Sequence, residues 1–268
     1  MPTDLLLLLS GVAAGAFGAL LGLGGGILIV PILTLGFGLP LSAAVGTSLV
    51  SVIATSAGAA AVNVRAGRAD VRLGLTLGVG TVVGALTGGL VAGLVPERVL
   101  AGLFAALLVY TAVTMLRGLR TRPEEEATET VDPAAPDGPD APRYRSTRVP
   151  VAVGGSFLAG NVSGLLGIGG GVVTVPLVHL LMGAPIRIAV ATSNYMIGIT
   201  AAAGAYTYLL RGDLDPRQAA PMVLGVAGGA ALGALVGTRF RTSWLIVLFV
   251  IVLGYVAFEM AMRALAPT

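Results

Sequence analysis

The stretch Gly18-Ala-Leu-Leu-Gly-Leu-Gly-Gly-Gly26, which continues to Pro31, has a second copy within Asn161-Val-Ser-Gly-Leu-Leu-Gly-Ile-Gly-Gly-Gly171, which continues to Pro176. A constant offset of 145 residues aligns the two copies, and 13 of the 27 positions from 14 to 40 are identical. The alignment continues without a gap to Asp70, which matches Asp215. We interpret this pattern as two homologous repeats.

The composition indicates a membrane protein. Hydrophobic residues make up 56% of the 268 residues and charged residues only 11%, whereas soluble domains have about 25% charged residues. Apolar runs of about 20 residues alternate with short charged patches, which is the pattern of membrane-spanning helices. We therefore predict an all-α integral membrane protein with about 8–10 membrane segments, located in the cell membrane as a multi-pass protein.

One segment differs from the rest of the chain. Residues 119–147 contain five prolines and the acidic run Glu124–Glu126, with few large apolar side chains. Such a segment cannot bury enough apolar surface to fold. We predict a disordered linker at 119–147 between a first transmembrane repeat at 1–118 and a second at 148–268. Because arginines flank this linker, we predict that it is cytoplasmic.

The glycine clusters must interrupt their helices. A continuous helix over residues 5–38 would be about 50 Å long, against a hydrocarbon core of about 30 Å. Irregular backbone at membrane depth is tolerated only inside protein or beside a water-filled cavity. Paired broken helices at matching positions of two repeats are typical of the binding sites of transporters, and a helix that restarts after a break can attract an anion.

The number of crossings within residues 5–38 stays open at this point. One crossing with a re-entrant part gives a parallel repeat, and two crossings give an inverted repeat. Counting the arginines on each side cannot separate these arrangements. We favour the inverted repeat because it places two broken helices of opposite direction at one midplane site.

Polar side chains within the apolar runs are candidate ligands. Thr47 and Ser48 match Thr192 and Ser193, and Asn194 follows the second pair. Neutral hydroxyl and amide donors can hold an oxyanion without the full charge that would prevent its release. Asn161 is a candidate for either a substrate contact or a hydrogen bond between helices.

Several classes of function are excluded by what the sequence lacks. It has no cysteine and one histidine, so it offers no Cys- or His-based metal site, and we expect neither metal nor cofactor. It has no lysine and no phosphate-binding loop of the nucleotide type. The apolar runs contain no Ser/His/Asp set or paired acids, so we do not expect an enzyme, and the scattered arginines do not predict nucleic-acid binding.

The twice-repeated glycine motif, with Ala44-Val-Gly-Thr-Ser48 and Ala189-Val-Ala-Thr-Ser193 downstream, resembles the TauE/SafE family of sulfite and organosulfonate exporters. The resemblance implies an inner-membrane transporter that exports sulfite, sulfoacetate or related sulfur oxyanions. One departure from the repeated pattern is Gly46, which becomes Ala191. The expected partners are a small anionic substrate and the lipid bilayer.

The predicted substrate-binding residues are the two glycine breaks, the two Thr-Ser pairs and two asparagines. They are Gly22, Gly24, Gly25, Gly26, Thr47, Ser48, Asn161, Gly167, Gly169, Gly170, Gly171, Thr192, Ser193 and Asn194. The alternatives to sulfur oxyanion transport are a different anion or solute, or a membrane subunit that transports nothing itself.

Overall fold

The computed structural model describes residues 2–21, 25–65, 67, 69–128, 149–184, 186–236 and 242–265, which form helices joined by turns. In the first half these are α1 (Pro2–Leu21), α2 (Gly26–Pro31), the π-helical turn η1 (Ile32–Gly36), α3 (Leu41–Arg65), α4 (Val71–Ala92) and α5 (Glu97–Thr128). In the second half they are α6 (Val149–Leu166), α7 (Gly171–Pro176), η2 (Leu177–Leu181), α8 (Ile186–Leu210), α9 (Pro216–Val236) and α10 (Thr242–Leu265). The order of elements in the second half repeats the order in the first.

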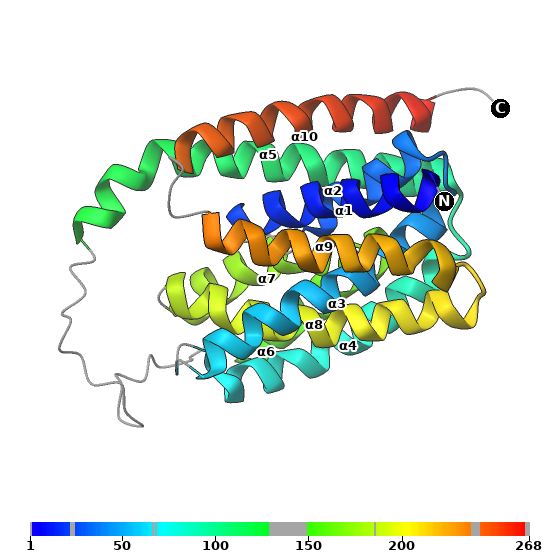
Figure 1. The fold of residues 1–268 in the computed structure, drawn as a ribbon. Helices are drawn as coiled ribbons and strands as arrows, with labels where there is room; N and C mark the ends of the chain where they lie inside the picture. The colour runs from blue at the N-terminus through cyan, green and yellow to red at the C-terminus, as the bar shows by residue number, and fades with distance from the viewer. Residues whose placement is uncertain are drawn as a thin grey trace.

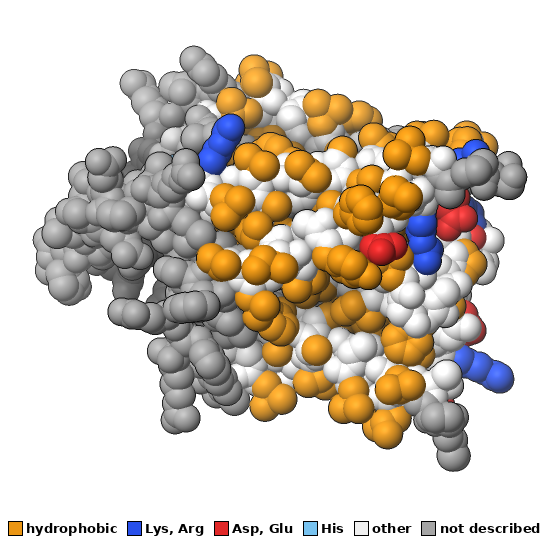
Figure 2. Space-filling view, turned by 90° about the horizontal axis from the view of Figure 1, so that it is seen from above, with side chains coloured by type: hydrophobic (Ala, Val, Ile, Leu, Met, Phe, Trp, Pro, Cys, Tyr) orange, Lys and Arg blue, Asp and Glu red, His pale blue; other side chains and the backbone are white. Residues whose placement is uncertain are grey.

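The all-helical class and the multi-pass membrane character are confirmed. Among the described residues, five helices are long and apolar enough to cross a bilayer, within Leu41–Arg65, Val71–Ala92, Glu97–Arg117, Ile188–Leu210 and Val247–Leu265. Shorter apolar helices at Thr3–Ala19, Gly26–Gly36 and Pro150–Leu166 accompany them. Figure 2 shows hydrophobic side chains spread over the face that carries α5 and α10, which is the surface expected to contact lipid.

The helices lie side by side in one bundle (Figure 1). The helix α5 lies beside α10 at one edge, and α4 lies beside α6 near the opposite edge. Between these pairs α1 packs along α9, and α3 packs along α8. The two halves therefore exchange helices, because the first helix of each half packs on the third full-length helix of the other half.

Glycines make this exchange possible. Gly225, Gly229 and Gly233 lie four residues apart on α9, and a Cβ on any of them would collide with the backbone of α1. Gly84 and Gly88 on α4 meet the backbone of α6 in the same way. Small residues let helix backbones approach closely in a membrane, where packing rather than the hydrophobic effect holds helices together. These spaced glycines therefore pack helices.

Matching helices of the two halves run in opposite directions. Gly46 near the start of α3 faces Tyr208 near the end of α8, while Ser56 farther along α3 faces Gly198. The α5–α10 pair is also antiparallel, since Gly102 faces Ala264 across it. These directions are the ones that an inverted repeat requires, although the internal duplication itself stays a prediction from the sequence.

The chain reverses at the first break. A Cβ on Gly25 would lie 3.4 Å from the carbonyl oxygen of Ala14, so α2 starts beside the middle of α1 and returns along it. The N-terminus and the start of α3 lie at the same end of the bundle (Figure 1). Because α2 and η1 together have only 11 residues, the return is about 16 Å long. The segment of α2 and η1 therefore starts inside the bundle and spans about half of the hydrocarbon core.

The predicted linker is described in part. The helix α5 continues to Thr128, so the first ten residues of the segment 119–147 are helical. Glu and Arg are good helix formers, which accounts for the extension beyond the apolar run. Residues 129–147 lie outside the described residues, as do Gly22 and Gly24 of the first break.

Candidate functional site at the two glycine breaks

The breaks require glycine because of their backbone conformation. Gly25 has a φ of 76° and immediately precedes α2, and Gly170 has a φ of 82° and immediately precedes α7. Side chains of L-residues rarely adopt this left-handed region. Both short helices therefore start from a turn that only glycine forms without strain.

The two breaks meet in the interior of the bundle. The Ser48 hydroxyl donates to the carbonyl oxygen of Gly26 at 3.1 Å and lies 2.7 Å from that of Gly167, so it bridges the first and second breaks. A Cβ on Gly26 would also lie 3.2 Å from the carbonyl oxygen of Ile168. The structure thus brings together Gly26, Ser48 and Gly167 from the predicted set.

The second break has buried hydroxyls without partners. Ser193 on α8 and Ser163 on α6 are fully buried, and neither Oγ has a hydrogen-bond partner within the part of the chain that the structure describes. Ser163 faces the break, since a Cβ on Gly170 would lie 3.3 Å from the Cβ of Ser163. Ser193 lies one helical turn before Ile197, whose side chain packs on Gly169 and Gly171.

The threonines of the two Thr-Ser pairs are also buried, Thr47 on α3 and Thr192 on α8. The Thr192 hydroxyl accepts a hydrogen bond from the Asp70 backbone N–H at 3.0 Å, and Asp70 in turn caps α4 through the N–H of Leu73. Thr192 therefore fixes the start of α4 to α8. Thr47 is buried on α3, where its carbonyl accepts a hydrogen bond from Ser51.

The two asparagines of the predicted set lie on α6 and α8. Asn161 donates through Nδ2 to the Thr87 hydroxyl at 3.1 Å, and its backbone packs against Gly84 and Gly88 of α4. Asn161 therefore joins α6 to α4 by a hydrogen bond between helices. Asn194 is half-buried on α8, next to Ser193.

Ser163 was missed by the sequence reasoning because its counterpart in the first copy is Gly18. Matching polar pairs between the copies therefore could not find it. A polar residue within an apolar run, two positions after Asn161, was the signal that could have done so.

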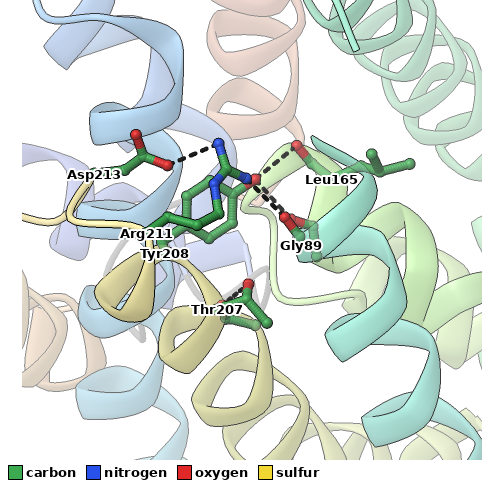
Figure 3. A network of polar contacts seen from close by, with 8 residues as sticks. Gly89, Leu165, Thr207, Tyr208, Arg211 and Asp213 are labelled. Atoms are coloured by element: carbon green, nitrogen blue, oxygen red, sulfur yellow. Dashed lines mark hydrogen bonds and ion pairs between the residues drawn. The ribbon is translucent and has the colours of Figure 1, made fainter. Parts of the chain in front are cut away.

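A second cluster, also unpredicted, fastens the end of α8 to α4 and to the end of α6 (Figure 3). Arg211 donates to the carbonyl oxygen of Gly89 on α4 at 2.8 Å and forms an ion pair of 2.8 Å with Asp213. Its guanidinium lies 5.2 Å from the centre of the Tyr208 ring. The Tyr208 hydroxyl donates to the carbonyl oxygen of Gly164, in the last turn of α6, at 2.9 Å. We call Tyr208, Arg211 and Asp213 the α8 latch.

The described residues do not gather three or more His, Asp or Glu side chains that could hold a metal ion. The chemistry on offer at the breaks is therefore that of hydroxyl groups and backbone.

Comparison with known proteins decides the family. Residues 7–260 match the family described as "Sulfite exporter TauE/SafE". The chain belongs to the TauE/SafE family. Similar proteins of Bacillus subtilis and Haemophilus influenzae are each named "Probable membrane transporter protein"; they are 28% identical over 92% of this chain and 93% of the relative, and 27% identical over 97% and 98%. A relative of the same description from Methanocaldococcus jannaschii is 28% identical over 76% of this chain and 72% of its own length.

No solved structure matches the chain. As a member of the TauE/SafE family, the chain is a membrane transporter. Its family and its apolar helices agree on a multi-pass location in the membrane.

Proposed function

We propose that this chain exports small sulfur oxyanions such as sulfite, sulfoacetate or other organosulfonates, and that it binds them at the second glycine break. The observation that carries the proposal is the pair of fully buried hydroxyls of Ser163 and Ser193, which have no hydrogen-bond partner among the described residues. An unsatisfied buried polar group destabilises a protein by about 1–3 kcal/mol. An oxyanion would supply the missing acceptors.

The neutrality of the site suits transport. Ser163 and Ser193 donate hydrogen bonds but carry no charge, so they would hold an anion without trapping it. Selectivity would follow from the number and spacing of the oxygens that the hydroxyls reach. The substrate contacts in this proposal are these serines with the glycine backbone, while Thr192 and Asn161 support the surrounding helices.

The driving force fits an exporter. In the described part of the chain, six arginines lie toward the end of the bundle that faces the linker, and four lie toward the other end: Arg65, Arg72, Arg117, Arg120, Arg122 and Arg187 against Arg98, Arg211, Arg217 and Arg263. An excess of arginine marks the cytoplasmic side. A negative-inside potential expels an anion with about 2.3 kcal/mol per charge per 100 mV. Efflux therefore needs no coupling carboxylate beside the breaks.

The α8 latch gives the mechanism an element that can move. It holds α8 to α4 and to the end of α6 at the end of the bundle opposite the linker. In our proposal, loss of the Arg211–Gly89 contact lets this end open toward the outside, and the opposite motion exposes the breaks to the cytoplasm.

The alternatives are transport of another small solute and a role as a membrane subunit that transports nothing itself. We also propose that the chain catalyses no reaction, since its relatives are named as membrane transporters and its apolar runs contain no Ser/His/Asp set or paired acids.

The test is a substrate panel on purified protein in liposomes. Sulfite, sulfate, thiosulfate, sulfoacetate and chloride are compared by flux, with and without an imposed membrane potential. We expect selective, potential-sensitive movement of sulfur oxyanions. Protein that is folded and inserted but moves none of these anions would support one of the two alternatives instead.

A further inference from the structure

A polar cavity lies at the end of the bundle where α5 begins, away from the end where α5 leads toward the linker. It has a volume of about 210 Å³, and its polar lining is Thr34 of η1, Glu97 and Arg98 of α5, and Arg263 of α10. One water needs about 10–15 Å³ of such space, so a small oxyanion fits together with several waters. Two other cavities, one along α1 and one between α5 and α10, have almost wholly apolar linings.

The charges of this cavity favour an anion. No carboxylate of the described residues lies within 4.0 Å of the guanidinium of Arg98 or of Arg263. Arg263 uses one Nη2 donor on the carbonyl oxygen of Thr34, at 3.1 Å. A guanidinium has five N–H donors, so Arg263 keeps others for a ligand. Arginine also presents its donors in a planar fork that matches an oxyanion.

The carboxylate in the lining has a separate task. Glu97 Oε1 accepts the backbone N–H of Leu41, the first residue of α3, at 2.7 Å. It therefore holds the start of α3 while it lowers the positive charge of the cavity. Two guanidinium groups against one carboxylate leave a net charge of +1.

We propose that this cavity is a second anion site, which binds a small oxyanion such as sulfate between Arg98 and Arg263 on the side opposite the linker. That the released substrate occupies this site during export rests on the proposed function, but the binding of an oxyanion to the site does not. Through Arg263 and Thr34 the bound anion would contact η1, the segment that continues from the first break.

The experiment measures thermal unfolding of the purified full-length protein in detergent against millimolar sodium sulfate, at constant ionic strength. Sulfate also stabilises proteins generally by exclusion from their surface, but that effect does not saturate at such concentrations and is common to all variants. We expect a saturable rise of the melting temperature. Arg98→Gln and Arg263→Gln should each raise the half-saturating concentration about tenfold or more.

Two further variants sharpen the result. Glu97→Gln keeps an oxygen acceptor for the Leu41 N–H but removes the negative charge, so it should lower the half-saturating concentration. Arg217→Gln removes an exposed arginine at the same end, at the start of α9, and should leave the curve unchanged. If an arginine variant fails to fold, the opposite shift in Glu97→Gln still tests the site.

The outcomes separate this site from the breaks. Saturation curves that are unchanged in both Arg98→Gln and Arg263→Gln overturn the proposal. A response lost in a Ser163→Ala, Ser193→Ala double variant but kept in the arginine variants places sulfate at the second break and also overturns it. Arginine-dependent binding in a protein without anion flux supports the second site and contradicts the proposed function.

Discussion

Ser48 and Ser193 occupy matching positions in the two copies, and both are fully buried. The Ser48 hydroxyl lies within hydrogen-bond distance of two carbonyl oxygens, Gly26 and Gly167, whereas the Ser193 hydroxyl has no partner among the described residues. The positions that would match those acceptors are Gly171 and Gly22, and Gly22 lies outside the described residues. The first copy thus uses its serine to join the breaks, while the serine of the second copy donates to no acceptor in the part of the chain that the structure describes.

This comparison indicates that two copies of one motif can have different roles. A broken helix needs one set of contacts to hold its backbone and another to receive the substrate. We infer that the first copy supplies most of the former and the second copy most of the latter. The variants below test this division, in order of decreasing expected effect.

The largest effect should come from Gly170→Val, with Gly25→Val as its counterpart. Valine cannot adopt a φ of 82° without strain, and its side chain would press on Ser163. We expect flux in liposomes to fall about 100-fold or more, since an ångström of displacement has that scale of effect on oriented groups. Gly154→Val, on the exposed face of α6 with nothing within 4 Å, is the control. Normal flux in correctly inserted Gly170→Val protein would contradict the site.

Ser193→Ala should weaken transport without lowering the stability of the protein. Loss of a hydrogen bond to an anion, worth about 1.5–3 kcal/mol, would raise the KM for the substrate roughly 10- to 100-fold. The melting temperature should stay the same or rise, because the alanine removes an unsatisfied buried hydroxyl. Ser163→Ala should behave alike. A drop in melting temperature with unchanged KM would assign these serines a structural role.

Ser48→Ala should lower the stability of the protein and change transport less than Ser193→Ala does. It leaves the carbonyl groups of Gly26 and Gly167 without their donor, so we expect a loss of about 1–3 kcal/mol in stability. The melting temperature in detergent should fall, while the KM changes less than in Ser193→Ala. If Ser48→Ala and Ser193→Ala instead give the same pair of changes, the division of work between the copies is wrong.

The smallest effect is expected from Arg211→Gln, which weakens the α8 latch. The positions of the latch correspond to Asn63, Ala66 and Arg68 in the first copy, so the latch is a feature of the second copy alone in sequence. Because the chain has no native cysteine, a single cysteine at Thr207 can report opening through its rate of labelling by a membrane-impermeant reagent. We expect a rise of a few-fold, as losing one charge-assisted hydrogen bond implies. No change in labelling would mean that the latch does not limit opening.

The sequence predicted the helical membrane class, the two breaks and the importance of glycine there, because these follow from helix length and local conformation. It could not separate Ser48 from Ser193, because the acceptor of Ser48 at Gly167 belongs to the other half of the chain, 119 residues away. The same reason hid the contact of Thr192 with Asp70 and that of Arg211 with Gly89. Whether 5–38 crosses once or twice depended on a reversal in space, which the arginine count could not detect.

The exchange of helices between the halves has a consequence for how the protein is made. Since α1 rests on α9, α1 leaves the ribosome well before its packing partner has been synthesised. Until then its glycine-containing face is exposed to lipid or to an insertion factor. Contacts of such long sequence separation slow folding, and waiting intermediates are prone to misassembly. We therefore expect the two halves of this transporter to assemble late in synthesis, once α9 is available to α1.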